Sequence, residues 1–436
     1  MTQHRMAVFA GVSRIGTVGF DSQEEAFSFE YDAEWSARGD SFSISPHILL
    51  HGAAPASGTV RRFLENLLPE GRALDIASTT YQVSRNNVYG LIRELGRETA
   101  GALTFLEEGR TPEGVETTKR EVTRDELAKR IAERAELPFS VWDNKVRLSI
   151  AGFQDKLAVY QEDGRMFLVE GRLASTHILK PEPVDKRTPF LVANEHFCMR
   201  LAARLDLPVA EVDIQRLPDA LLVVKRFDRI RRNDDVHRLH VVDACQALNV
   251  PVAYKYELNF GTGRDVRHIR DGVSFNRLNS LSDYTVRKAV TQRDLLRWAI
   301  FQYLIGNSDA HGKNVSFFAD PEGMALAPFY DLVSVAQYEG IDHEMAMAYG
   351  DEFVIANIRP YDWALFAQAV SAPRGLMVRE MRRMARLAEE QALEQTADGI
   401  YAQEERDMVG RISAFVVQQA RALAEAAEAT SSVELD

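Results

Sequence analysis

The chain has 436 residues, of which 46% are hydrophobic and 27% are charged, as in soluble globular proteins with two or three domains. Its formal net charge of −12, from 52 basic and 64 acidic side chains, excludes nucleic-acid binding by the molecule as a whole, so a DNA contact needs a local patch or a partner. Two cysteines, Cys198 and Cys245, are too few for a disulfide framework or a cysteine-based zinc site. Because no apolar run has the length of a signal-peptide core or a membrane span, we expect a cytoplasmic location and no membrane contact.

Residues 1–110 are expected to form an N-terminal domain that begins with strands. The short alternating segments "MAVFAG" and "TVGFD" predict strands, and "TVRRFLENLL" and "NNVYGLIRELG" are expected to be helical. The stretch "EEGRTPEGVETTKREVTRDE" (residues 107–126) is polar, charged and rich in turn residues. It predicts a linker or a surface excursion.

Residues 140–230 are expected to be β-rich with one helix. The predicted strands are "KVRLSI", "KLAVYQ", "RMFLVE" and "THILK". The stretch "TPFLVANEHFCMRLAARL" has a helical period, and "VAEVDIQRL" with "ALLVVKRF" predicts a hairpin around Pro218 and Asp219.

Residues 231–428 are expected to be mainly helical. The run "RDLLRWAIFQYLI" is apolar on nearly every face, which predicts a central buried helix with Trp298 and Phe301 in the core. The stretches "GLMVREMRRMARLAEEQALEQ" and "RISAFVVQQARALAEAAEA" predict amphipathic helices. The whole pattern indicates an α+β fold of a β-rich half and a helical half.

The loop "GNSDAHGKN" (residues 306–314), which follows the apolar helix, concentrates polar side chains. Asp309 precedes Asn314 by five residues, the spacing of a protein-kinase catalytic loop, and a strand, a turn and a second strand then lead to Asp331. We therefore expect Asp309 to be the catalytic base. Asn314 and Asp331 offer the hard oxygen ligands that Mg²⁺ prefers. His311 either orients Asp309 or hydrogen-bonds the loop backbone, and it is grouped with the residues that face ATP.

A second set of residues is expected to bind ATP. The stretch "SIAGFQDK" (residues 149–156) is a small-residue loop between strands, suited to presenting backbone N–H groups to phosphate. Lys180 ends a strand where kinases keep a phosphate-binding lysine, and Glu195 on the next helix is the candidate to position it. Residues 224–227 are expected to read the adenine. The expected ATP-binding residues are Ala151, Gly152, Phe153, Gln154, Asp155, Lys156, Lys180, Val224, Lys225, Phe227 and His311.

Each of these residues also has an ordinary structural interpretation. Taken alone, Asp309 is a loop cap, Lys180 a solvated strand end and Glu195 a charge on a helix surface. Their order along the chain, with kinase-like elements between them, favours the functional interpretation. The histidines lack the i, i+4 pairing of a zinc site, no G-x-S-x-G elbow is present, and "FGTGRD" lacks the strand-to-helix context of a dinucleotide site.

The sequence resembles the HipA family of bacterial serine/threonine kinase toxins, the toxin half of HipBA toxin–antitoxin modules. The resemblance rests on "FLENLLPEGRALDIA", "LIRELGRETAGALTFL", "LSIAGFQDKLAV", "THILKP", "NEHFCMRLA", "VVKRFDR", "DACQALN", "FQYLIGNSDAHGKNVSFF" and "LAPFYDLVS". It implies a two-lobed kinase-like fold: an N-terminal subdomain (residues 1–110), an N-lobe with the phosphate-binding loop (140–230) and a helical C-lobe with the catalytic loop and metal site (231–428). It also implies ATP and Mg²⁺ as cofactors, and Ser149 as a site of autophosphorylation that inactivates the enzyme, because phosphoserine adds nearly two negative charges beside a phosphate-binding site.

The resemblance further implies a substrate and partners. The substrate would be an aminoacyl-tRNA synthetase, glutamyl-tRNA synthetase or a relative, whose phosphorylation arrests growth and promotes persistence. The partner would be a dimeric helix-turn-helix antitoxin, HipB-like, which makes most of the contacts to operator DNA. Residues 374–386 form the best local basic patch for DNA or antitoxin, although a solvated helix face is the favoured interpretation.

Two other functions remain open. One is a catalytically silent, kinase-like co-repressor that binds the antitoxin, and the other is a kinase of small molecules on the same scaffold. The intact set of Lys180, Asp309, Asn314 and Asp331 argues against the silent protein.

Overall fold

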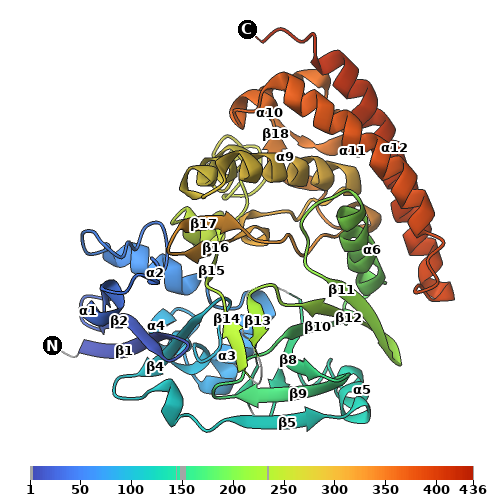
Figure 1. Cartoon of the computed structure of the whole chain (residues 1–436). Helices are drawn as coiled ribbons and strands as arrows, with labels where there is room; N and C mark the ends of the chain where they lie inside the picture. Colours follow the sequence, from blue (N-terminus) through green and yellow to red (C-terminus); the bar gives the residue numbers. More distant parts are fainter. Residues whose placement is uncertain (1–2, 144, 148–153, 233–234, 436) are drawn as a thin grey trace. The chain divides into compact units, whose positions relative to one another are not determined.

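The computed structural model describes residues 3–143, 145–147, 154–232 and 235–435. The chain divides into two compact units, each made of segments distant in sequence (Figure 1). Unit 1 comprises Met1–Val184, Gln215–Val252 and Phe317–Ala325, and unit 2 comprises Asp185–Ile214, Ala253–Ser316 and Leu326–Asp436. Unit 1 holds most of the strands and unit 2 the longest helices, so the predicted α+β class is confirmed.

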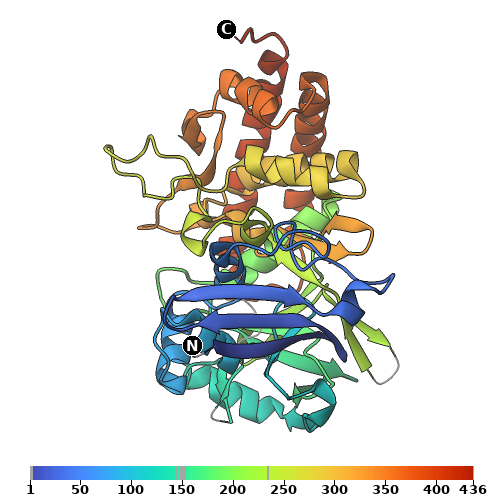
Figure 2. The same cartoon turned by 90° about the vertical axis from the view of Figure 1, so that its left-hand side faces the viewer.

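The N-terminal residues of unit 1 form a four-stranded antiparallel sheet in the order β3-β2-β1-β4, and Figure 2 shows β1, β2 and β3 from one side. Val8, Val18 and Leu103 are buried in this region, and the first two lie in the segments predicted as strands. Helix α4 begins after Asn87, whose side chain accepts the Gly90 N–H at 2.8 Å, a common N-cap. The elements here are β1 Gln3–Ala10, β2 Ser13–Asp21, β3 Ala26–Tyr31, α1 Ala33–Ser36, α2 Ser57–Glu65, α3 Gly71–Tyr81, α4 Val88–Leu95 and β4 Leu103–Glu107.

A six-stranded sheet has the strand order β11-β12-β10-β8-β9-β5. Leu157, Leu179 and Leu221, all fully buried, share a core with Leu127 and Ile131 of helix α5. The predicted hairpin of β11 and β12 is confirmed. The elements are β5 Thr118–Val122, α5 Arg124–Ala132, β8 Leu157–Glu162, β9 Arg165–Glu170, β10 His177–Pro181, β11 Val212–Leu217 and β12 Asp219–Lys225.

The predicted linker at residues 107–126 is wrong in part, because it contains β5 and the start of α5. Strand β5 pairs with β9 from Thr118 opposite Glu170 to Val122 opposite Met166. It lies at the edge of the sheet, and only Val122 of its five residues is buried. An edge strand that buries so little shows no apolar alternation, so its sequence looks like a loop.

A buried ionic cluster follows β12 within unit 1. The Asp228 carboxylate accepts hydrogen bonds from Arg226 at 3.0 and 2.8 Å and from Arg229 at 2.7 Å. It also accepts the Gly101 N–H at 2.9 Å. Burial opposes ionisation of Asp228, but the charges of Arg226 and Arg229 outweigh it and lower the pKa of the carboxyl.

The same cluster includes Glu98, Ser175 and Arg238. The Ser175 hydroxyl donates to Glu98 at 2.5 Å and accepts from Arg226 at 2.9 Å. Arg238 donates to the Leu103 carbonyl at 2.7 Å. These residues, Glu98, Ser175, Arg226, Asp228, Arg229 and Arg238, are called the arginine cluster below. They tie the segment between α4 and β4 to the end of β12 and to strands β13 (Arg229–Arg232) and β14 (Asp235–Arg238).

Smaller elements complete unit 1. Two hairpins and a three-stranded sheet in the order β15-β16-β17 accompany the two larger sheets. The elements are β6 Val141–Trp142, β7 Lys145–Val146, β13 Arg229–Arg232, β14 Asp235–Arg238, β15 Val241–Asp243, α7 Ala244–Ala247, β16 Ser316–Asp320 and β17 Gly323–Leu326.

Helix α9 is the buried centre of unit 2. Trp298 and Phe301 are both 0% exposed, as predicted for a helix that is apolar on nearly every face. The helix ends at Gly306, where φ is +63° and a Cβ would meet Phe415 and Ala336 at 2.7 Å; only glycine combines that conformation with that space.

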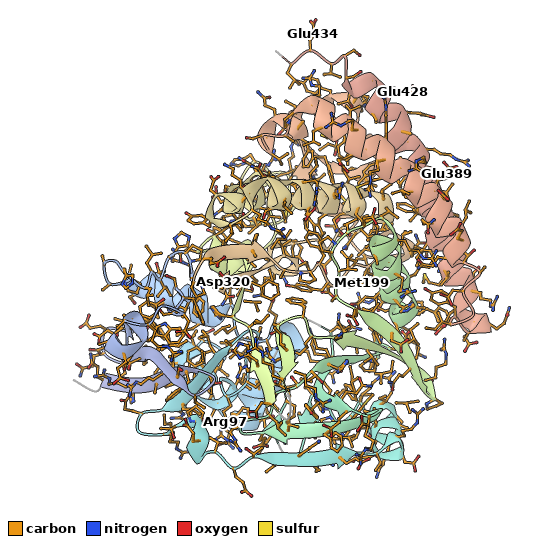
Figure 3. All side chains as sticks on the ribbon, in the orientation of Figure 1. Arg97, Met199, Asp320, Glu389, Glu428 and Glu434 are labelled. Carbon is orange, nitrogen blue, oxygen red and sulfur yellow. The ribbon has the colours of Figure 1, made fainter. Side chains whose placement is uncertain are left out.

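Long helices pack around α9 in unit 2. Helices α11 and α12 run side by side, with the labelled Glu389 and Glu428 on them (Figures 1 and 3). An ion pair of 2.8 Å joins Glu389 to Arg421, and Ser413 donates to the Ala392 carbonyl at 3.0 Å. The elements are α6 Leu191–Arg204, α8 Phe275–Ser280, α9 Lys288–Ile305, β18 Glu344–Tyr349, β19 Glu352–Val354, α10 Pro360–Ala369, α11 Arg374–Gln395 and α12 Arg406–Thr430.

Two expectations from composition can be compared with these elements. Cys198 and Cys245, which are too few for a disulfide framework, are both buried. Within the described ranges, every helix is either too short or too polar to cross a lipid bilayer.

Candidate active site

The loop after α9 exposes one carboxylate. Residues 306–308 and 310–314 are buried, whereas Asp309 is exposed. The loop is held to α9, because the Asn307 side chain donates to the Gln302 side chain at 2.9 Å and accepts the Asp309 N–H at 3.2 Å. Ser308 donates to the Asp342 carbonyl at 3.0 Å. A rigid loop therefore presents the Asp309 carboxylate to solvent, as a proton acceptor for a bound substrate must be.

Asn314 and Asp331 lie together in unit 2. The Asn314 amide donates to Asp331 Oδ2 at 3.1 Å, and its oxygen accepts the His311 N–H at 2.9 Å. Asp331 has φ of +60°, a left-handed conformation that Asp adopts more readily than most residues. The structure thus brings together two oxygen-bearing side chains that are seventeen positions apart.

This pair fits Mg²⁺ better than a transition metal. Mg²⁺ takes one or two protein carboxylate or amide oxygens and completes its shell with water and phosphate. Among the described residues, no group of three His, Cys, Asp or Glu side chains could hold a metal ion, so a zinc-type site has no support within those ranges.

His311 is buried against an aromatic ring. Burial, with the charge of Lys255, lowers the pKa of His311 to about 3, so the imidazole is neutral at physiological pH. Its ring meets that of Tyr256 edge-on, with centroids 5.1 Å apart. The proposed contact of His311 with ATP stays a prediction.

Tyr256 is the residue that sequence reasoning missed. Its hydroxyl donates to Asp309 Oδ1 at 2.5 Å. Tyr256 lies in "VAYKYELNF" (residues 252–260), a mixed polar and apolar stretch without motif or period. Nothing in that pattern indicates a contact with a loop more than fifty residues away.

Two of the predicted phosphate-binding residues are buried lysines in unit 1. Lys156 and Lys180 are each 7% exposed. Strands β8 and β10 are antiparallel with Leu157 opposite Leu179, so the same register sets Lys156 beside Lys180. Two lysines at adjoining positions concentrate positive charge where the sequence predicts phosphate binding.

The rest of the predicted phosphate-binding loop is described only in part. Gln154 and Asp155 precede β8, and burial raises the pKa of Asp155 against the opposing charges of Arg72 and Arg134. The Gln154 amide lies 3.5 Å from the Pro181 carbonyl. The predicted Ser149, Ala151, Gly152 and Phe153 lie outside the described residues.

The segment predicted to bind the adenine, residues 224–227, lies at the end of β12. Val224 is buried and pairs with Ile178 of β10, whereas Lys225 is exposed. Phe227 is half-buried and meets Phe318 edge-on, with centroids 5.9 Å apart. Arg226 and Asp228 belong to the arginine cluster, so the residues on both sides of Phe227 are held in place.

Glu195 lies on α6 in unit 2 and is 2% exposed. Lys180, which it is expected to position, belongs to unit 1. That pairing stays a prediction.

Comparison with known proteins identifies the family. The family model of the HipA N-terminal domain matches residues 6–106, and that of the HipA-like C-terminal domain matches residues 148–395. A serine/threonine-protein kinase toxin HipA from Shewanella oneidensis is 43% identical over 375 residues, which cover 85% of this chain and 84% of that protein. The chain belongs to the HipA family. The resemblance inferred from the motifs is confirmed, and so is the class of enzyme, a serine/threonine-protein kinase.

Other relatives agree with this HipA assignment. The protein Y4mE of Sinorhizobium fredii is 33% identical over 380 residues, 85% of this chain and 87% of its own length. The solved complex of HipA, HipB and operator DNA from the Shewanella oneidensis toxin–antitoxin system contains a chain with a TM-score of 0.88 and 37% identity, covering 99% of this chain and 100% of that one. The predicted kinase-like α+β fold is thereby confirmed.

Proposed function

We propose that this HipA-family kinase transfers the γ-phosphoryl group of ATP to a serine hydroxyl of a protein, with Asp309 as the base. The observation that carries the proposal is the exposure of Asp309 in an otherwise buried loop, five residues before an Asn314 that hydrogen-bonds Asp331. The serine oxygen forms a bond to the γ-phosphorus while the bond from that phosphorus to the β,γ-bridging oxygen breaks. ADP leaves with that oxygen, and the hydroxyl proton passes to the Asp309 carboxylate.

Unit 2 would also hold the metal. Asn314 and Asp331 would each offer one oxygen to Mg²⁺, which when bound neutralises the negative charge of the phosphates. The hydrogen bond of 3.1 Å from the Asn314 amide to the Asp331 carboxylate keeps the two side chains together before the ion binds.

Unit 1 would supply the nucleotide-binding residues. Lys156 and Lys180 would face the phosphates together with the backbone of residues 151–155, and Glu195 of unit 2 would position Lys180. The backbone of Val224 and Lys225 would read the adenine edge while Phe227 packs on its face. The register of β8 and β10, which sets the two lysines at adjoining positions, supports this assignment, because two neighbouring ammonium groups suit a ligand with several phosphate groups.

The protein substrate is proposed from the family. We infer that the kinase phosphorylates an aminoacyl-tRNA synthetase, glutamyl-tRNA synthetase or a relative, and so arrests growth and promotes persistence. Phosphorylation of its own Ser149 would switch the enzyme off, because the phosphate would compete with the nucleotide phosphates for the same positive charges.

The partners are proposed from the solved relative. The Shewanella oneidensis HipA occurs in a complex with HipB and operator DNA, and we infer a similar helix-turn-helix antitoxin dimer for this chain. With a net charge of −12, the chain would depend on that antitoxin for most contacts to DNA. A cytoplasmic location follows from these partners.

The test is phosphoryl transfer from γ-³²P-labelled ATP to purified glutamyl-tRNA synthetase. We expect label on the synthetase with the natural chain and with Asp320→Asn, a control at the exposed β16–β17 turn (Figure 3), and none with Asp309→Asn. Label on the kinase alone would refute the synthetase as the substrate but not the kinase activity. Label on neither protein would refute the kinase and favour the silent co-repressor.

A further inference from the structure

Tyr256 contacts the proposed base through a hydrogen bond. Its hydroxyl donates to Asp309 Oδ1 at 2.5 Å, and a donor to a carboxylate favours the ionised form of that group. The bond engages one of the two carboxylate oxygens. The proposed reaction needs the other, Oδ2, to face the acceptor hydroxyl.

The backbone around Tyr256 is clamped on both sides. The carbonyl of Lys255 accepts the Gly312 N–H of the catalytic loop at 2.9 Å, and the Glu257 N–H donates to the Ala346 carbonyl at 3.0 Å. A Cβ at Gly272 would lie 1.7 Å from the Tyr256 carbonyl oxygen. The segment is therefore hydrogen-bonded to the catalytic loop on one side of Tyr256 and to β18 on the other, with the Gly272 backbone close to its carbonyl.

The residue after Tyr256 adds a buried anchor. Glu257 is 3% exposed, and its carboxylate accepts the Ala348 N–H at 2.8 Å and a guanidinium N–H of Arg270 at 2.6 Å. A buried carboxylate with these partners resists displacement, because leaving either charge unpaired inside the protein is costly.

The Tyr256 ring is held as firmly as its backbone. It meets the His311 ring edge-on at 5.1 Å, and the Lys255 ammonium lies 5.3 Å from its centroid. The backbone hydrogen bonds, the ring contacts and the hydrogen bond to Oδ1 together place the phenol against the Asp309 carboxylate. We infer that Tyr256 is a positioning residue of the kinase: its hydroxyl fixes the rotation of the Asp309 carboxylate and stabilises the ionised form that accepts the proton.

This inference rests on the proposed function, and a kinetic experiment tests it in that context. Purified full-length Tyr256→Phe is compared with the natural chain in self-phosphorylation by γ-³²P-labelled ATP and Mg²⁺. We expect the rate at saturating ATP to fall about tenfold, the effect of losing a hydrogen bond to a charged group, while the half-saturating ATP concentration changes less than about twofold. Tyr254→Phe is the matched control, since its ring packs on Phe260 at 6.4 Å, and it should match the natural chain.

A titration gives a readout that needs no activity. With ¹³Cγ-labelled aspartate, the Asp309 resonance is identified by its loss in Asp309→Asn, and its pKa should rise in Tyr256→Phe because the donor is gone. Lys255, Lys313 and Asp331, whose charges act on the nearby His311, are the same in both proteins. The acid limb of the rate profile should move to higher pH in parallel.

Three results would overturn the inference. The first is an unchanged rate together with an unchanged Asp309 titration. The second is a faster rate in Tyr256→Phe, which would mean that the phenol competes with the acceptor hydroxyl. The third is an unchanged rate at saturating ATP together with a raised half-saturating ATP concentration. If the natural chain transfers no phosphoryl group, the proposed function fails, and the titration alone decides whether Tyr256 acts on Asp309.

Discussion

Replacing Asp228 by Asn is expected to destabilise unit 1 strongly. The substitution keeps the shape of the side chain and removes one of the two carboxylates that face Arg226, Arg229 and Arg238 in the arginine cluster. Arg226 and Arg229 are each at most 2% exposed as side chains, so water cannot replace the lost partner.

The magnitude follows from the contacts of that carboxylate. It accepts hydrogen bonds of 2.7–3.0 Å from Arg226, Arg229 and the Gly101 N–H. Breaking a buried ion pair by removing one partner costs about 3–5 kcal/mol, mostly because the remaining charge is left uncompensated. We expect the free energy of unfolding of unit 1 to fall by about this amount.

Urea denaturation followed by circular dichroism and tryptophan fluorescence gives that free energy by linear extrapolation. The control is Asp219→Asn, at the exposed start of β12, which should change it by less than about 0.5 kcal/mol. A loss below about 1 kcal/mol in Asp228→Asn would refute the idea that the arginine cluster holds the segment between α4 and β4 to strands β12, β13 and β14.

The effect has a defined pH dependence. The folded state lowers the pKa of Asp228, so its contribution is present above the unfolded pKa near 3.9 and is lost as pH falls towards the folded value. The difference between the natural chain and Asp228→Asn should therefore be full at pH 7 and shrink below about pH 4. A difference that grows on acidification would contradict the sign.

Three further predictions concern the metal ligand Asn314, the glycine packed against Tyr256, and the buried histidines. Asn314→Ala should raise the Mg²⁺ concentration needed for half-maximal phosphoryl transfer at least about tenfold, measured by Mg²⁺ titration; an unchanged requirement would remove the ligand assignment. Gly272→Ala should lower the urea midpoint by an amount equivalent to more than about 2 kcal/mol, because its Cβ would lie 1.7 Å from the Tyr256 carbonyl. Burial lowers the pKa of His240 to about 4 and that of His311 to about 3. Both histidines therefore contribute stability at pH values above the unfolded pKa near 6.5, and this stability is lost as the pH falls from there towards the folded pKa values. Equal urea midpoints at pH 7.5 and pH 5 would contradict this.

Much of the local structure could be predicted from sequence periods. Helix α9 and the β11–β12 hairpin follow from apolar patterns and turn residues that act over a few positions. Strand β5 was missed because it buries only Val122. The periodic spacing of apolar residues reflects which face of a segment is buried. An edge strand such as β5 buries very little, so its sequence carries no such spacing.

The candidate site was predictable where its residues are close in sequence. Asp309 and Asn314 form a motif with a fixed spacing, and the short hairpin after them leads to Asp331. Tyr256 approaches Asp309 from 53 positions away, and Glu98 reaches Ser175 from 77. Such contacts depend on how the chain folds back on itself, and no local preference encodes them.

The most direct test is intact-mass spectrometry with phosphosite mapping after incubation of the purified, unphosphorylated chain with ATP and Mg²⁺, beside Asp309→Asn. We predict one added phosphoryl group, on Ser149, in the natural chain and none in the variant. Normal phosphorylation of the variant would remove Asp309 as the base. No added mass on a natural chain that binds ATP would contradict the kinase activity itself.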